Sequence, residues 1–525
     1  MREYGMVIGQ ANPQFFDFNI TDPDHKPVSY EYVQVELEET LPNGETKRVE
    51  VLGQVKSITS SHPFYDKRTT PGAAWKQREL GIGRDMLQVI ANAKILGYLR
   101  KEFGRTEVRR PRSPPMPGTP VYRASDRLLQ QLFSLDERDL PLSVGNLLHR
   151  EEIKVPISGR ELHRHTAILA MTRYGKSYFA GKVMEELLRL GASIIAIDAH
   201  GDYSNIVQSP AGRLHDFYHD KVTVYRPKGA EPFEAPHVEP LRISVSGCSL
   251  EELCGLARIT GSLQTILLRN AIRKARSEST LYTLDDIIER LEEDMPDRAE
   301  GRRRVHRIVM RLENLRNQGI FTSGDLELSS FFRPMHLNDV FLSGLSDYVQ
   351  DVLVGMILRR VFMAKFRKEP WARLPVFIFV EEAHRFAAPK DMGGGRFSRD
   401  ILARIAAEGS KFGVFLTVIS QRPRKIDSDI LSNCSNMAIL RIVNNLDQNT
   451  IQAASESFSE DLLDDLPALE QGEAVLIGPF VPAPVMIRTA ERETRHGGVT
   501  PDIYGLLREA REDSESREWD TDKLY

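Results

Sequence analysis

The sequence predicts an α/β protein in which a parallel-sheet core carries a helical insertion and follows a small β-barrel. Three observations predict it: the first hundred residues alternate apolar and polar positions, short apolar runs alternate with amphipathic stretches from about residue 151, and residues 249–319 are helical and highly charged. The predicted segments are an N-terminal β-barrel with a proline-rich stretch over 1–150, a core over 151–245 and 335–490, a helical insertion over 246–334 and a C-terminal extension over 491–525.

Composition excludes several classes of protein. The 525 residues include 70 Lys+Arg and 74 Asp+Glu, a net charge of −4, so any contact with nucleic acid must use a local basic patch. The cysteines Cys248, Cys254 and Cys434 form no C-x-x-C pair and fit a reducing compartment. The N-terminus lacks the pattern of a signal peptide, and no apolar run approaches the roughly 20 residues that cross a bilayer. We expect a soluble, cytoplasmic protein.

An Asn-Gly turn lies between two strands of the predicted barrel. Tyr30–Thr40 alternates apolar and polar residues, Asn43-Gly44 supplies the turn, and Val49–Ile58 resumes the alternation, which is the strongest local hairpin signal. Residues 109–120 contain five prolines, which remove backbone donors. We therefore expect an exposed loop or surface crossing there.

A candidate phosphate-binding loop follows in Ala170–Ser177 (AMTRYGKS). The pattern for such loops is Gly, four residues, then Gly-Lys-Ser/Thr; the chain keeps Gly175-Lys176-Ser177 and has Ala170 first. The loop lies between a short apolar strand and a helical stretch, which is the context that the chemistry requires. Backbone N–H groups would face the phosphates, Lys176 would reach the β- and γ-oxygens, and Ser177 would offer its hydroxyl to Mg²⁺. An ordinary strand–turn–helix is the alternative.

Acidic and amide side chains follow other predicted strands. Val376–Val380 runs into Glu381 and Glu382, another strand ends at Asp198, and a third ends at Gln421. We expect the glutamate strand beside the phosphate-loop strand, with the first acid near Mg²⁺ and the second polarising the attacking water. Dipole complementation at a helix start is the alternative for this pair. Asp198 would assist Mg²⁺ or water, or cap its turn; Gln421 would sense the γ-phosphate or bond within its loop.

These motifs in order resemble the HerA branch of the HerA/FtsK superfamily of P-loop ATPases. They are RHTAILAMTRYGKS, IDAHGDY, FVEEAHRF, and IAAEGSKFGVFLTVISQRP leading to SNMAILRIVNN, and the N-terminal segment with GMVIG looks like the small HAS barrel that precedes this motor. The resemblance implies a RecA-like core with ATP and Mg²⁺ as cofactors. It also implies a homo-hexameric translocase or helicase that passes double-stranded DNA through its pore and works with a NurA-like nuclease in DNA end resection and repair.

The resemblance further implies roles for individual residues. Ser177 and Glu381 would hold Mg²⁺, Glu381 and Glu382 fill the Walker B positions, and Gln421 falls on the sensor position. The nucleotide would be bound by the loop and the first helical turn, which comprise Thr172, Arg173, Tyr174, Gly175, Lys176, Ser177 and Tyr178. Among these, Arg173 and Tyr174 replace the common Gly and Ser and add bulk beside the phosphates.

Three basic residues are candidates for contact with phosphates. Arg164 matches a basic position that the resemblance suggests reaches a neighbouring subunit's nucleotide. Lys411 stands where a basic pair is usual and cannot supply the bidentate fork of an arginine. Arg441 is a further candidate. In addition, three glycines and two arginines in residues 393–399 (GGGRFSR) predict a loop that contacts DNA, with a disordered surface loop as the alternative.

Two other functions are alternatives to DNA repair. One is a same-family ATPase in an antiviral defence complex with a nuclease or NAD-cleaving effector. The other is a nucleotide-gated scaffold with little turnover that recruits a partner. A secretion or conjugation motor is disfavoured because such motors usually carry membrane segments.

Overall fold

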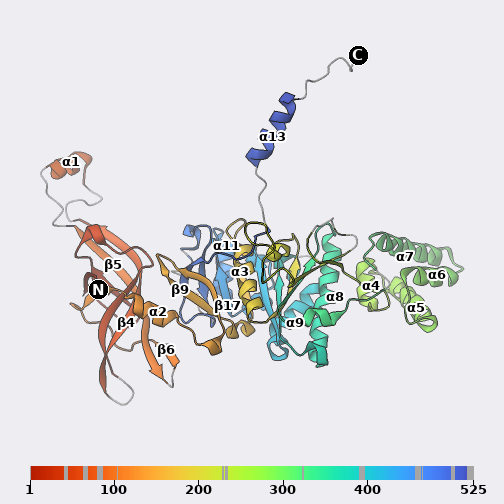
Figure 1. Ribbon diagram of the computed structural model, residues 1–525, viewed down its shortest axis with the longest axis horizontal. Helices are drawn as coiled ribbons and strands as arrows, with labels where there is room; N and C mark the ends of the chain where they lie inside the picture. The colour runs from red at the N-terminus through yellow and green to blue at the C-terminus, as the bar shows by residue number, and fades with distance from the viewer. Residues whose placement is uncertain are drawn as a thin grey trace.

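The computed structural model describes most of the chain. The residues outside the description are 1, 41–44, 63–68, 80–86, 103–104, 228–229, 231–234, 322–323, 390–396, 456–462, 464, 498–502 and 517–525. Figure 1 shows a small β unit at one end, a sheet covered by helices in the middle and a helical unit at the other end.

The N-terminal unit is a closed β-barrel, as predicted. Its strand order is β2-β1-β7-β3-β4-β5, a pairing of β2 with β5 closes it, and β6 extends it beyond β5. The predicted hairpin is present, because β3 pairs with β4 in antiparallel register from Tyr32↔Gln54 to Thr40↔Thr46, while its Asn-Gly turn lies outside the described residues. The strands are β1 (Glu3–Ile8), β2 (Phe15–Asn19), β3 (Tyr32–Thr40), β4 (Thr46–Ser61), β5 (Gln88–Glu102), β6 (Arg105–Arg109) and β7 (Pro120–Arg123).

Seven parallel strands form the centre of a 12-stranded core sheet. They are buried on both faces, which explains why they read as continuous apolar runs. The phosphate-loop strand β10 lies between β16 and β17, so the expectation that the glutamate strand β15 is its direct neighbour is wrong. The central strands are β10 (Thr166–Leu169), β11 (Ser193–Asp198), β12 (Val222–Arg226), β14 (His336–Phe341), β15 (Val376–Val380), β16 (Val414–Ser420) and β17 (Asn436–Ile439). The short outer strand β13 (Val238–Pro240) pairs with β12.

The other side of the sheet is an antiparallel extension. After β17 come β18 (Glu473–Ile477), β19 (Val485–Thr489), β8 (Pro141–Leu147) and β9 (Arg150–Ser158). Since β8 pairs with β19, residue 150 lies inside a hairpin of the core sheet, whereas the sequence analysis ended the barrel there. An alternating strand pattern shows that a strand has two different faces but does not identify the sheet edge with which it pairs.

Helices cover both faces of the core sheet. On one face α2 (Asp126–Phe133) and α3 (Lys176–Arg189) pack in one apolar cluster with Ile168 and Ala196. On the other face α8 (Asp347–Phe366) and α9 (Phe397–Phe412) pack in a second cluster with Leu169 and Ile195. The alternating direction of strand side chains separates these two clusters. The short helices α10 (Ser428–Ser432) and α11 (Asn445–Ala454) follow β16 and β17.

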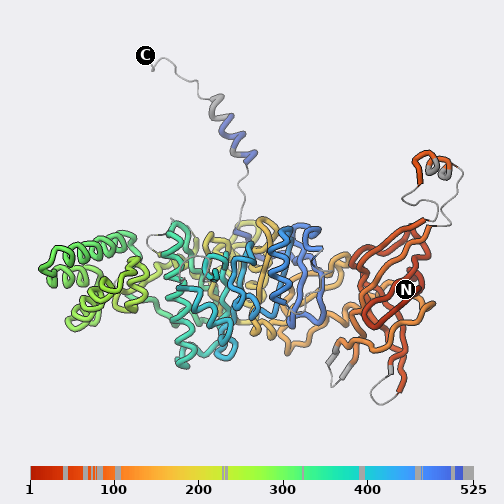
Figure 2. Tube along the Cα trace, turned by 180° about the vertical axis from the view of Figure 1, so that it is seen from behind, coloured from red at the N-terminus to blue at the C-terminus, as the bar shows by residue number. Residues whose placement is uncertain are grey.

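The helical insertion lies at the end of the molecule opposite the barrel (Figure 2). It leaves the core after β13 and returns at β14, which agrees with the predicted insertion. Its helices are α4 (Leu250–Leu256), α5 (Ser262–Glu278), α6 (Leu284–Glu293) and α7 (Ala299–Asn317). Two further helices stand away from the body in Figure 1, namely α1 (Pro71–Glu79) beside the barrel and the C-terminal α13 (Ile503–Ser516). Within the described residues, no helix combines the length and apolarity that crossing a membrane would need.

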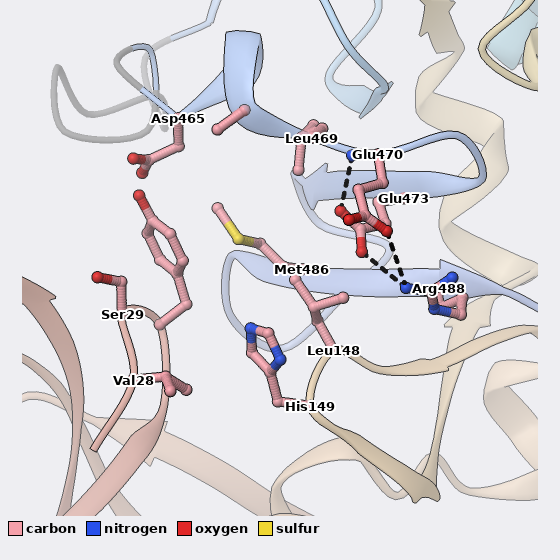
Figure 3. A pocket seen from close by; sticks show the side chains of 12 residues that line it. Val28, Ser29, Leu148, His149, Asp465, Leu469, Glu470, Glu473, Met486 and Arg488 are labelled. Atoms are coloured by element: carbon pink, nitrogen blue, oxygen red, sulfur yellow. Dashed lines mark hydrogen bonds and ion pairs between the residues drawn. The ribbon is translucent and has the colours of Figure 1, made fainter. Parts of the chain in front are cut away.

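The barrel packs against the antiparallel side of the core. The rings of Tyr32 and Phe133 meet edge to face, with their centroids 6.2 Å apart. A cavity of about 380 Å³ lies at this junction, between Val28–Tyr30 on the barrel side and the β18–β19 region of the core (Figure 3). On its wall, Arg488 donates to Glu473 over 3.0 Å. The junction therefore combines apolar and charged contacts.

Candidate functional site

The phosphate loop joins β10 to α3 at the carboxyl edge of the sheet. Arg173 and Gly175 have φ angles of 68° and 96°, in the left-handed region. Left-handed residues in a tight loop turn backbone N–H groups toward a common anion, and the start of α3 adds its positive end. Gly175 meets this need without strain. Ala170 is fully buried and donates its N–H to the Ser420 carbonyl over 3.2 Å, so the departure from the glycine pattern lies on the strand side of the loop.

Lys176 joins this loop to the glutamate pair. Its Nζ donates to Oε1 of Glu381 over 2.5 Å and to Oε1 of Glu382 over 3.0 Å, and the Ser177 hydroxyl donates to the same Glu381 oxygen over 3.2 Å. Burial lowers the pKa of Lys176, but the charges of the two glutamates outweigh it and raise that pKa. Two strand spacings of about 4.8 Å separate β10 from β15, because β16 lies between them. The side chains of Lys176 and Glu381 together are long enough to meet across this distance.

Glu382 is held in a defined orientation. Its φ of 48° is left-handed, which turns the side chain out of the strand direction. Oε1 also accepts from Nε2 of Gln421 over 3.1 Å, and Nδ1 of His384 lies 3.1 Å from Oε2. The Thr172 hydroxyl donates to the Gln421 carbonyl oxygen, so Gln421 connects the phosphate loop to Glu382. Burial raises the pKa of Glu382, but His384 and Lys176 outweigh it and lower the pKa to about 2.

The contact between His384 and Glu382 predicts a pH effect. With its pKa near 2, Glu382 stays ionised throughout the neutral and mildly acidic range. His384→Ala removes an interaction that favours the ionised carboxylate, so the pKa of Glu382 rises. We expect the ratio of the hydrolysis rate at pH 5.5 to that at pH 8 to fall in this variant. His384→Gln retains a donor and should lower the ratio less. Equal ratios in all three proteins would show that His384 does not tune Glu382.

Tyr203 is a site residue that the sequence analysis missed. It is fully buried, and its hydroxyl donates to Oε2 of Glu381 over 2.5 Å. Asp198 positions the same turn, because it accepts from the N–H groups of His200, Gly201 and Tyr203 over 2.9, 2.8 and 3.0 Å. Both Asp198 oxygens are thus engaged, and the structure favours the turn-capping alternative over an auxiliary acid. Burial and the neighbouring Asp202 raise the Asp198 pKa to about 7.

Arg441 lies at the phosphate loop, where a residue that contacts phosphates must lie. Its guanidinium is 5.0 Å from the centre of the Tyr174 ring, and its carbonyl accepts from the Met171 N–H over 2.9 Å. Its Nε is buried and has no hydrogen-bond partner among the residues that the structure describes. An arginine with an unused donor beside an anion-binding loop is suited to contact a phosphate. Tyr178 instead directs its hydroxyl to the N–H of Arg492, 2.8 Å away.

Arg164 and Lys411 lie at the opposite edge of the sheet. Arg164 ends the short helix η4 (Arg160–Arg164) before β10, and Lys411 is in the last turn of α9 before β16. The four residues of β10 alone span about 13 Å. Neither side chain therefore reaches the phosphate loop of its own chain. Arg164 is half exposed and its Nε is 2.9 Å from Glu161.

The predicted DNA loop lies largely outside the described residues, including Arg396. Its last arginine, Arg399, is described: its Nη2 is 2.8 Å from Asp427, which caps the start of α10. Both side chains of this pair are largely buried. Arg399 therefore holds α9 to α10, which corrects the expectation that its charge is available to DNA.

Comparison with known proteins identifies relatives that match most of the length of this chain. A family model described as the helicase HerA central domain matches residues 142–361. The chain is 31% identical over 429 residues to the probable helicase MJ1565 of Methanocaldococcus jannaschii, covering 78% of each chain. It is also 31% identical over 474 residues to the DNA double-strand break repair helicase HerA of Pyrococcus furiosus, covering 80% of each. For HerA of Saccharolobus solfataricus the identity is 26% over 519 residues, which covers 97% of this chain and 96% of the relative.

Proposed function

This chain belongs to the HerA helicase family, and from that premise we propose that it is a ring-forming motor that uses ATP and Mg²⁺ to move double-stranded DNA. As a member of the family, it is an ATP-hydrolysing helicase or translocase. The observation that carries the proposal is the convergence of Lys176, Glu381, Glu382 and Gln421 on one phosphate loop.

The contacts of the site support a division of roles in hydrolysis. Ser177 and Glu381 supply adjacent oxygens, the ligands that Mg²⁺ prefers, and the ion would neutralise charge on the triphosphate. Lys176 now bridges the two glutamates, and a bound triphosphate would offer it a stronger anionic partner. Glu382 would then accept a proton from the attacking water, with Gln421 orienting that water against the γ-phosphate.

The positions of Arg164 and Lys411 support the proposal that the protein forms a ring. Both basic residues lie at the sheet edge opposite their own phosphate loop, so each would act on the nucleotide of a neighbouring subunit. A cation supplied in trans stabilises charge in the transition state of phosphoryl transfer. Hydrolysis would then depend on assembly, and we propose a homo-hexamer as the assembled form.

We further propose that the ring acts with a NurA-like nuclease in DNA end resection and repair. The names of two relatives above, from Pyrococcus furiosus and Saccharolobus solfataricus, describe DNA double-strand break repair helicases, which supports a repair role. The nuclease partnership rests on the family resemblance of the motor motifs.

A steady-state ATPase assay with and without double-stranded DNA tests the motor. We expect Mg²⁺-dependent hydrolysis that DNA stimulates several-fold, and no hydrolysis above background in Lys176→Ala. Arg495→Ala is the control and should match the wild type, because the Arg495 side chain is exposed and bonds only Gln208 among the contacts described. Negligible hydrolysis by the wild-type protein in both conditions would contradict the motor and favour a nucleotide-gated scaffold.

A further inference from the structure

The positions of the acidic residues determine which way a bound triphosphate points. Glu381 and Glu382 follow β15 and Gln421 follows β16, and both strands lie on the same side of β10. The γ-phosphate that these residues would serve therefore points to that side of the loop. The nucleoside, at the other end of the triphosphate, must extend toward β17, β18 and β19.

The end of β19 lies at the same sheet edge as the phosphate loop. β17 is parallel to β10, β18 is antiparallel to β17, and β19 is antiparallel to β18, so β19 runs with β10 and ends at Thr489. The Thr489 N–H donates to the Gly472 carbonyl over 2.8 Å, and the Gly472 N–H points to the Tyr174 carbonyl at 3.5 Å. Thr489 is thus one residue removed from the loop. Its hydroxyl is buried with no hydrogen-bond partner in the described part of the chain.

The segment after β19, residues 490–496, crosses α3, and we call it the C-terminal strap. Its Arg492 donates from Nε to Oε1 of Glu185 over 3.0 Å, and both side chains are almost fully buried. The backbone N–H of Thr494 donates to the same carboxylate over 3.2 Å. A buried, hydrogen-bonded ion pair on a rigid helix fixes the strap in one position beside the loop.

The strap also contacts the residue that follows the phosphate-binding serine. The Arg492 N–H donates to the Tyr178 hydroxyl, and the His496 ring meets the Tyr178 ring edge to face with centroids 5.8 Å apart. Burial and Arg492 lower the pKa of His496, so its imidazole is neutral and can both donate and accept a hydrogen bond. Aromatic surface and an unused hydroxyl together suit a nucleoside, whose base is planar and whose ribose carries hydroxyls.

We propose that Thr489, Tyr178 and His496 form the nucleoside half of the ATP site, with Thr489 bonding the sugar or base and the two rings contacting the base. This proposal rests on the proposed function and extends it from the phosphates to the rest of the nucleotide. Thr489, just before the strap, and His496, at its end, are then parts of the nucleotide site, although they lie about 300 residues from the phosphate loop in sequence.

Binding of ATP and of inorganic tripolyphosphate, each with Mg²⁺, tests the proposal on the full chain. The variant is Thr489→Val with His496→Ala, which removes the hydroxyl and the imidazole. It also removes the 3.5 Å contact between Nη1 of Arg492 and Nδ1 of His496, and it keeps the hydrogen bond from Nε of Arg492 to Glu185. We expect ATP to bind about tenfold more weakly and tripolyphosphate to bind within about twofold of wild type, because only ATP carries a nucleoside. Arg495→Ala is the matched control on the same strap; Arg495 is exposed and bonds Gln208, so both ligands should bind as in wild type.

Three other results of the binding experiment would contradict the proposal or the function on which it rests. Unchanged ATP binding in the double variant would place the nucleoside elsewhere and overturn the proposal. Equal weakening of both ligands would show a general loss of the site and would also overturn it. If the wild-type protein bound neither ATP nor tripolyphosphate, the proposed function itself would fail, which is distinguishable from a failure of the nucleoside assignment alone.

Discussion

Glu382→Gln should lower kcat for ATP hydrolysis by about 10²–10⁴-fold and leave the Kd for ATP within about threefold of wild type. The reason is that glutamine retains an acceptor for Lys176 and Gln421, whose donors now meet Oε1 of Glu382, but cannot take a proton from water. Single-turnover hydrolysis and equilibrium ATP binding, measured on the same preparation, separate the two quantities.

Glu381→Gln is the companion variant for this experiment. Glu381 accepts from Lys176, Ser177 and Tyr203, so its loss should mainly raise the Mg²⁺ concentration needed for half-maximal activity. If Glu382→Gln retained a kcat within tenfold of wild type while Glu381→Gln lost hydrolysis at saturating Mg²⁺, the roles of the two glutamates would be reversed.

Arg164→Ala should inactivate hydrolysis about 10³-fold, and mixing it with the equally inactive Lys176→Ala chain should restore part of the activity. In a one-to-one mixture, an interface is complete when one subunit retains Lys176 and its neighbour retains Arg164. Random assembly makes about a quarter of the interfaces complete, so recovery should approach about a quarter of the wild-type rate. Hydrolysis measured across a series of mixing ratios should peak near equal amounts.

Two controls make the mixing experiment specific. Arg160→Ala changes an exposed arginine in the same short helix and should retain full activity. Lys411→Ala, mixed with Lys176→Ala in the same way, tests whether the lysine also acts across the interface. An absence of recovery at every ratio of Arg164→Ala to Lys176→Ala would refute action in trans.

Most of the candidate nucleotide site follows from the sequence, for a physical reason. A phosphate loop is a local structure: a buried strand, a tight turn and a helix start are contiguous, so Gly175-Lys176-Ser177 identify it without tertiary information. The glutamate pair and Gln421 were predictable because polar side chains at the carboxyl ends of parallel strands meet at one sheet edge. In the structure, Nζ of Lys176 lies 2.5 and 3.0 Å from the two glutamates, and Nε2 of Gln421 lies 3.1 Å from Glu382.

Other site residues could not be assigned from sequence because their roles depend on contacts between distant segments. Tyr203 lies five residues after Asp198, a spacing visible in the sequence, yet its bond to Glu381 joins residues 178 positions apart. The sequence predicted that Arg399, in a glycine-rich loop, has a charge available to DNA. In the structure Arg399 forms an ion pair with Asp427, which joins α9 to the start of α10. A charge pattern shows which residues carry charge and does not show which of them are neutralised.

The sequence by itself therefore determined the class of this protein, the barrel, the phosphate loop and the acids that lie beside it, because each depends on local periodicity or on a short contiguous motif. Only the tertiary structure decided the strand order that places β16 between the loop and the glutamates, the transfer of β8 and β9 to the core sheet, and the course of the strap over α3. Strand order and side-chain pairing depend on the free energy of packing the whole chain, and a linear pattern of residue types does not encode which surfaces meet.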